Sequence, residues 1–168
     1  MNNHKSSKHS YILQDFLPLI SIFGFIVLFT VSKQWWYGWH MYTAMSDFMG
    51  AFFVIFGLFK IVNLHGFVEA YRMYDIVAQR SKVYAYIYPF IELMLGIAYL
   101  TRFQLFSTNV ITFILMFVSS IGVGLELAKG KKIVCACLGA VFKIPMTYVT
   151  LAEDVVMGIM ALIMLYMA

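Results

Sequence analysis

The chain has 168 residues, of which 62% are hydrophobic, 18% aromatic and only 12% charged. Soluble domains carry about 25% charged residues, so this composition excludes an ordinary soluble enzyme and indicates an integral membrane protein. Twelve Lys and Arg residues against eight Asp and Glu residues give a net charge of +4. In a membrane protein such an excess reports orientation, and we therefore expect no nucleic-acid binding.

Apolar runs predict five membrane-spanning helices, because a helix needs about 20 residues to cross a bilayer. A polar tail at residues 1–10 precedes the first run, Phe16 to Ser32, and the bulky residues after this run argue against signal-peptide cleavage. The other four helices are expected at about 44–62, at about 83–100, between Arg102 and Glu126, and from about Val149 to the C-terminus. The predicted fold class is all-α, an integral membrane bundle of five transmembrane helices.

Two of the segments that connect the predicted helices have sequence patterns that indicate more than a plain loop. Residues 66–82 place Phe67 and Tyr71 at helical spacing opposite Glu69, which predicts an interfacial amphipathic helix. Residues 128–148 begin with basic side chains and then become small and apolar around a Cys-x-Cys motif. This second segment is the Cys-x-Cys loop between the last two predicted helices.

The basic residues predict the orientation of the chain. Nine of them fall on one side of the membrane: Lys5, Lys8, Arg72, Arg80, Lys82, Lys129, Lys131, Lys132 and Lys143. Only Lys33 and Arg102 fall on the opposite side, so the positive-inside rule places the N-terminus and the Cys-x-Cys loop in the cytoplasm. Trp35 and Trp36 would then anchor the outer side at the headgroup level.

Cys135 and Cys137 are the two cysteines of the chain. Thiolates suit Cu(I) and other thiophilic metals, and two sulfurs one residue apart can bind a two-coordinate ion. The same pair could alternate between a dithiol and a strained, readily reduced disulfide. Both residues could also be small apolar packing side chains. The spacing alone leaves these three interpretations open.

Ionisable side chains inside the predicted helices are a second group of candidates. Each costs about 3 kcal/mol on insertion scales, so such residues tend to be paired and functional. Glu92 lies within the third predicted helix, and we expect Lys60 to be its partner. Glu153 and Asp154 lie in the first turns of the last helix, where acids also stabilise the helix N-terminus.

Methionine is frequent, with 12 residues, and Met157 and Met160 belong to one stripe of the last predicted helix. Thioethers bind Cu(I), so this stripe could form a metal path. A methionine stripe at helical spacing is more often a helix contact. The sequence has no phosphate-binding loop, zinc-protease motif or nucleophile elbow, and we expect the protein not to be an enzyme.

Several short motifs between Asp47 and the C-terminus follow one another in an order that is typical of a known family. They are Gly57-Leu-Phe-Lys60, Gly66-Phe67, Tyr88-Pro-Phe-Ile-Glu-Leu93, Cys135-Ala-Cys-Leu-Gly139, Pro145-Met146 and Thr150-Leu-Ala-Glu-Asp154. This order resembles the MauE branch, named for methylamine utilisation, of the DoxX-like membrane proteins. The resemblance implies a four-helix membrane domain at residues 44–168, to which residues 11–43 add an N-terminal helix and an outer aromatic loop.

The resemblance also implies a function. MauE proteins are thought to support thiol/disulfide-linked processing or maturation of a partner, as for methylamine dehydrogenase, in a bacterial-type inner membrane. Cys135 and Cys137 would be the redox or metal thiols, and the supporting residues would be Leu138, Gly139, Pro145, Met146, Glu153 and Asp154. The alternative is binding or transport of Cu(I) or another thiophilic metal through this loop and the Met and Glu residues.

The implied partners are the lipid bilayer and a redox or metal-binding protein. A disulfide role needs an oxidising partner, whereas the predicted cytoplasmic position of the loop favours reduced thiols and metal transfer. Gly122 and Gly124 allow close helix packing, either within the bundle or between copies in an oligomer.

Overall fold

The computed structural model describes residues 17–129 and 147–167. The long helices are α1 (Leu17–Tyr37), α2 (Met41–Val62), α5 (Lys82–Thr101), α6 (Leu105–Ala128) and α7 (Thr147–Met167), and the short ones are α3 (Leu64–Tyr71) and α4 (Ile76–Arg80). Within these described residues, five helices are long and apolar enough to cross a membrane. The prediction of an all-α bundle with five spanning helices is therefore confirmed.

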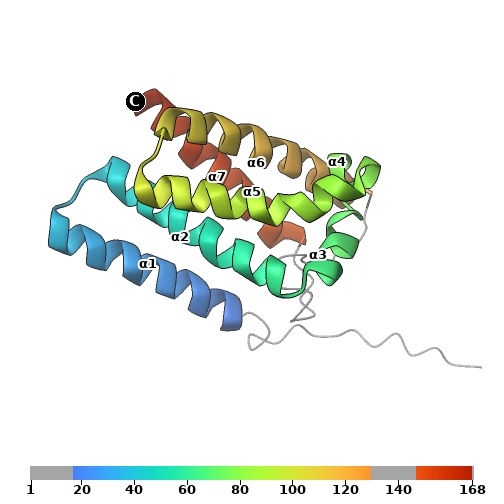
Figure 1. Cartoon of the computed structure of the whole chain (residues 1–168), viewed down its shortest axis with the longest axis horizontal. Coiled ribbons are helices and arrows are strands. Elements are labelled where there is room, and N and C mark those ends of the chain that lie inside the picture. Colours follow the sequence, from blue (N-terminus) through green and yellow to red (C-terminus); the bar gives the residue numbers. More distant parts are fainter. Residues whose placement is uncertain (1–16, 130–146, 168) are drawn as a thin grey trace, which may run out of the picture.

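The long helices form two closely packed pairs, α2 with α5 and α6 with α7. Helix α1 lies at the edge of the bundle and packs mainly against α2 (Figure 1). Successive long helices run in alternating directions, so α3 and α4 share one end of the bundle with the end of α6 and the start of α7. We call this the α3–α4 end; the turns after α1 and α5 lie at the opposite end.

Small residues allow α2 and α5 to approach closely. A Cβ atom added at Gly96 of α5 would lie 2.9 Å from the backbone nitrogen of Val54 and 3.1 Å from the carbonyl oxygen of Gly50, both in α2. Only glycine fits such a contact, in which the two backbones touch. This packing fixes α2 against α5 and so sets the positions of their charged side chains.

The segment predicted as one amphipathic helix over 66–82 instead contains two short helices and the start of α5. Asp75 caps α4, because its Oδ1 accepts hydrogen bonds from the backbone nitrogens of Val77 (3.0 Å) and Ala78 (2.7 Å). Ser81 caps α5 in the same way, with its Oγ 3.3 Å from the nitrogen of Tyr84. These polar side chains replace intrahelical hydrogen bonds and divide the segment.

Candidate functional site

Buried polar and aromatic side chains gather at the α3–α4 end of the bundle. Here the described chain stops at Lys129, after α6, and resumes at Thr147, the first residue of α7. The helices α2, α3, α4 and α5 bring further residues to the same end (Figure 1). Both points from which residues 130–146 leave the described structure therefore belong to this end.

The centre of the site is an ion pair between Lys60 of α2 and Glu92 of α5. The Lys60 ammonium donates to both carboxylate oxygens of Glu92, and the two side chains are only 6% and 4% exposed. The Lys60 nitrogen also lies 5.6 Å from the ring centre of Phe67 and 5.1 Å from that of Tyr88. A buried pair is stabilised only when further contacts compensate for lost hydration, and the two aromatic faces supply such contacts.

A group of tyrosines in aromatic contact extends this centre toward the end of the bundle. Tyr71 of α3 lies 4.5 Å from Tyr88, 5.0 Å from Phe67 and 5.5 Å from Tyr74, measured between ring centres. Tyr71 is 2% exposed, and burial raises the pKa of its hydroxyl well above 10.0. The Tyr71 hydroxyl therefore stays protonated at neutral pH.

Asp75 lies beside these tyrosines, between α3 and α4, and is fully buried. Burial raises the pKa of its carboxyl group, while hydrogen bonding to Ala78, Tyr71 and Val77 lowers the pKa in part. Sequence analysis assigned no role to Tyr74 or Asp75, and it used Tyr71 only as one aromatic residue of the predicted amphipathic helix. The sequence feature that could have indicated this tyrosine cluster is the i, i+4 spacing of Tyr84 and Tyr88, which places two aromatic rings on one face of α5.

The acidic residues of α6 and α7 lie at the same end but point to different neighbours. The Ser119 hydroxyl of α6 donates to Asp154 Oδ2 of α7 at 2.6 Å. Lys129 donates to Glu126 Oε1 at 2.6 Å, next to the point where the described chain stops. Glu153 lines an apolar pocket of about 340 Å³ together with Phe23, Phe48, Phe52 and Met157.

A comparison with protein families identifies the chain. The family model described as "Methylamine utilisation protein MauE" matches residues 14–167. The chain belongs to the MauE family. The match includes α1 as well as the other four long helices, and it includes the Cys-x-Cys motif. No curated protein and no solved structure matches the chain.

For this MauE-family chain, the structure brings together only part of the predicted site. Lys60 contacts Glu92, as described above, whereas Asp154 accepts a hydrogen bond from Ser119 of α6 and Glu153 lines the pocket next to Phe23 of α1. Six predicted residues lie outside the described ones: Cys135, Cys137, Leu138, Gly139, Pro145 and Met146. Their proposed roles stay predictions.

The methionines of the predicted metal path lie in the apolar interior of the MauE-family bundle. Met157 is 1% exposed and belongs to the core cluster that includes Phe52 and Phe56. Met160 is half-buried and packs against the same cluster. Among residues 17–129 and 147–167, no group of three or more His, Cys, Asp or Glu side chains is arranged to hold a metal ion.

Proposed function

We propose that this MauE-family chain is a membrane accessory protein that exchanges a disulfide with a partner protein during the partner's maturation. The exchanging thiols are Cys135 and Cys137. The observation that carries the proposal is the family match over residues 14–167, which runs through the Cys-x-Cys motif. Further support comes from the α3–α4 end, where both connections to residues 130–146 meet a buried polar cluster.

The chemistry is a thiol–disulfide exchange in two steps. A thiolate of the reduced partner attacks one sulfur of the Cys135–Cys137 disulfide, and the other sulfur leaves as a thiolate. The second thiolate of the partner then attacks the mixed disulfide. The partner gains a disulfide and the chain is left with two thiols, so two electrons and two protons pass from the partner to the chain. The small ring of a Cys-x-Cys disulfide is strained, which favours this direction.

Lys60 and Glu92 act as positioning residues in this proposal. Their ion pair joins the end of α2 to the middle of α5, and the surrounding rings fix α3 on the same helices. The Ser119–Asp154 hydrogen bond fixes the start of α7 against α6. A rigid base of this kind would hold the two ends of the exchanging segment at a constant separation.

A second candidate function, thiophilic metal binding by a reduced Cys pair, is favoured by the distribution of charge. Arg72, Arg80, Lys82 and Lys129 belong to the α3–α4 end, and Lys33 and Arg102 to the opposite end. The positive-inside rule then directs the α3–α4 end to the cytoplasm of a bacterial-type inner membrane. Cytoplasmic thiols are kept reduced, and reduced thiols suit Cu(I).

One labelling experiment separates the two functions. Intact cells are treated with a membrane-impermeant maleimide, with and without prior reduction. Two reference variants on a Cys135→Ser/Cys137→Ser background report the sidedness: Gln79→Cys at the α3–α4 end and Ser107→Cys at the opposite end, both at exposed positions. External labelling of the Gln79 reference, with the native pair labelled only after reduction, is the result expected for disulfide exchange.

The opposite result supports metal binding. In that case the Ser107 reference is labelled from outside, and the native pair is found as free thiols once the membrane is opened. Free thiols at an externally exposed α3–α4 end contradict the exchange proposal. Normal partner maturation and normal metal binding in a correctly inserted Cys135→Ser/Cys137→Ser variant contradict both functions.

A further inference from the structure

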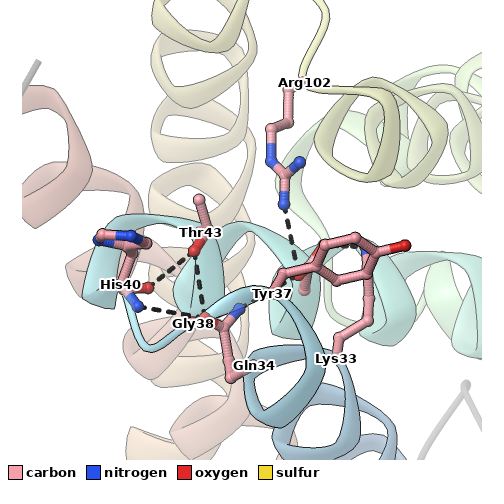
Figure 2. A pocket seen from close by; sticks show the side chains of 8 residues that line it. Lys33, Gln34, Tyr37, Gly38, His40, Thr43 and Arg102 are labelled. Atoms are coloured by element: carbon pink, nitrogen blue, oxygen red, sulfur yellow. Dashed lines mark hydrogen bonds and ion pairs between the residues drawn. The ribbon is translucent and has the colours of Figure 1, made fainter.

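A polar pocket lies at the opposite end of the bundle, away from the site described above. It has a volume of about 490 Å³ and is formed by the end of α1, the turn into α2 and the residue after α5 (Figure 2). Asp47 of α2 is at its base, with a side chain that is only 1% exposed. Lys33 Nζ lies 2.6 Å from Asp47 Oδ1, and Arg102 Nη2 lies 3.5 Å from Asp47 Oδ2.

The charges that line this pocket do not balance. Lys33 and Arg102 carry two positive charges and share the single carboxylate of Asp47. Their side chains are 30% and 46% exposed, and between them they have more N–H donors than one carboxylate can occupy. The pocket therefore has a surplus of one positive charge, and an oxyanion suits its remaining donors.

Arg102 has a backbone conformation that glycine adopts more easily than arginine. Arg102 caps the C-terminus of α5 in the left-handed conformation, with φ 57° and ψ 31°. Glycine is the usual residue at such a position because any Cβ atom is strained there. An arginine that accepts this strain, and whose guanidinium reaches the pocket, points to a use for the cation.

The residues around the pocket indicate that the oxyanion belongs to a lipid headgroup and is not a free anion. The three tryptophans of the chain, Trp35, Trp36 and Trp39, lie beside the pocket and are 69% to 86% exposed. Indole rings concentrate at the headgroup level of a bilayer. Below them, Phe25 and Leu28 of α1 are also more than half exposed and offer an apolar surface to acyl chains.

We propose that this pocket binds the phosphate of an anionic phospholipid headgroup between Lys33 and Arg102, with the acyl chains along α1. A phosphate diester presents to the two cations two non-bridging oxygens that share one negative charge, and guanidinium and ammonium groups both recognise phosphate. The surplus positive charge favours an anionic lipid over a zwitterionic one.

The tryptophans allow a direct test without a label, because all three lie within residues 35–39. The purified full chain, in a neutral detergent, is titrated with short-chain phosphatidylglycerol, with short-chain phosphatidylcholine and with inorganic phosphate while tryptophan fluorescence is followed. We expect saturable binding of phosphatidylglycerol, at least about tenfold tighter than that of phosphatidylcholine. Equal affinity for the two lipids, or no saturable change, would overturn the proposal. Inorganic phosphate binding as tightly as phosphatidylglycerol would show that a free anion, and not a lipid, is the ligand.

Variants distinguish a binding site from a structural charge cluster. Arg102→Gly keeps the left-handed turn and should weaken phosphatidylglycerol binding about tenfold, and Lys33→Gln should do the same. Asp47→Asn, which removes the competing carboxylate, should tighten binding. Lys82→Gln makes the same charge change at the α3–α4 end and should have no effect.

Circular dichroism checks that each variant is folded, and only folded variants are compared. Weaker binding in Asp47→Asn, or equal loss in Lys82→Gln, would show that the charge cluster has a structural role or that binding depends only on net charge. Either result contradicts the proposal that Lys33 and Arg102 bind a lipid phosphate. Unchanged binding in both Arg102→Gly and Lys33→Gln contradicts it as well.

Discussion

Lys60 and Glu92, which are 32 residues apart in the sequence, form a buried ion pair between α2 and α5. The pair carries no net charge, and its cation lies over the rings of Phe67 and Tyr88. A membrane interior provides no water for either partner. The two residues therefore depend on each other more strongly than a surface pair does.

The first prediction concerns this dependence. Glu92→Gln leaves the Lys60 charge buried without its counter-ion, so we expect a loss of about 3 to 5 kcal/mol in the free energy of unfolding. Replacing both residues by methionine should restore most of the stability, since a pair exchanged for apolar side chains of similar size is often neutral. Reversible unfolding in a denaturing detergent measures both changes.

The control is the exposed His65–Glu69 pair, whose side chains are 74% and 72% exposed. Glu69→Gln should change the unfolding free energy by less than about 0.5 kcal/mol. A Glu92→Gln variant as stable as this control would show that the buried pair contributes nothing to holding α2 on α5.

A second prediction compares two glycines of α6. A Cβ atom at Gly122 would lie 2.6 Å from the carbonyl oxygen of Tyr74 and 3.2 Å from Cα of Asp75, whereas one at Gly124 would meet nothing within 4 Å. Gly122→Ala should therefore push the α3–α4 connection off α6 and cost about 1 to 3 kcal/mol. Gly124→Ala should be neutral or stabilising by up to about 1 kcal/mol, because alanine favours helix more than glycine does.

The same unfolding measurement tests both glycine variants. Equal stabilities would contradict the close contact between α6 and the Tyr74–Asp75 backbone. The result also bears on oligomerisation, because a Gly122 that packs within the bundle has no room to form a contact between copies.

Some of this organisation could be predicted from the sequence. The five helices follow from apolar runs of sufficient length, and Lys60 was expected to partner Glu92 because a charge inside a membrane needs a counter-charge. The division of residues 66–82 was not foreseen, because the spacing of Phe67 and Tyr71 indicated one continuous amphipathic helix and Asp75 was not considered as a helix cap. The grouping of Asp47 with Lys33 and Arg102 was also missed. Each of these charges marks the end of a different helix, and only the tertiary arrangement shows that the three ends meet.

A third prediction concerns pH. Burial raises the pKa of the Asp75 carboxyl above its unfolded value of 3.8, so the folded state binds this proton more tightly than the unfolded state does. The stabilising contribution is fully present below about pH 3.8 and is lost as the pH rises through the folded-state pKa. Stability should therefore fall with rising pH in this interval because of Asp75.

Asp75→Asn isolates this effect. The asparagine side-chain oxygen can still accept from Val77 and Ala78, so the cap on α4 is kept, but the titration is removed. The pH dependence of unfolding should become flatter in Asp75→Asn than in the unmodified chain between pH 4 and neutrality. Asp75→Ala, which removes the cap as well as the titration, should be about 1 kcal/mol less stable than Asp75→Asn at every pH. Identical pH profiles for the unmodified chain and Asp75→Asn would show that the titration of Asp75 does not cause the fall in stability with rising pH.

The final prediction separates packing from metal transport in α7. Met157 lies in the core at 1% exposure and Met160 packs against the same core. Leucine has a similar volume, so Met157→Leu and Met160→Leu should each cost less than about 1.5 kcal/mol. If the two residues only pack, cells producing either variant should tolerate and accumulate copper like cells producing the unmodified chain.

Met94→Leu, at a residue 72% exposed, provides the control for a general effect of losing one thioether. Leucine cannot bind Cu(I), whereas a methionine thioether can. A folded Met157→Leu variant with altered copper accumulation, beside an unaffected Met94→Leu variant, would therefore contradict the packing assignment. The same result would favour the metal function over disulfide exchange, because exchange at Cys135 and Cys137 requires no thioether on α7.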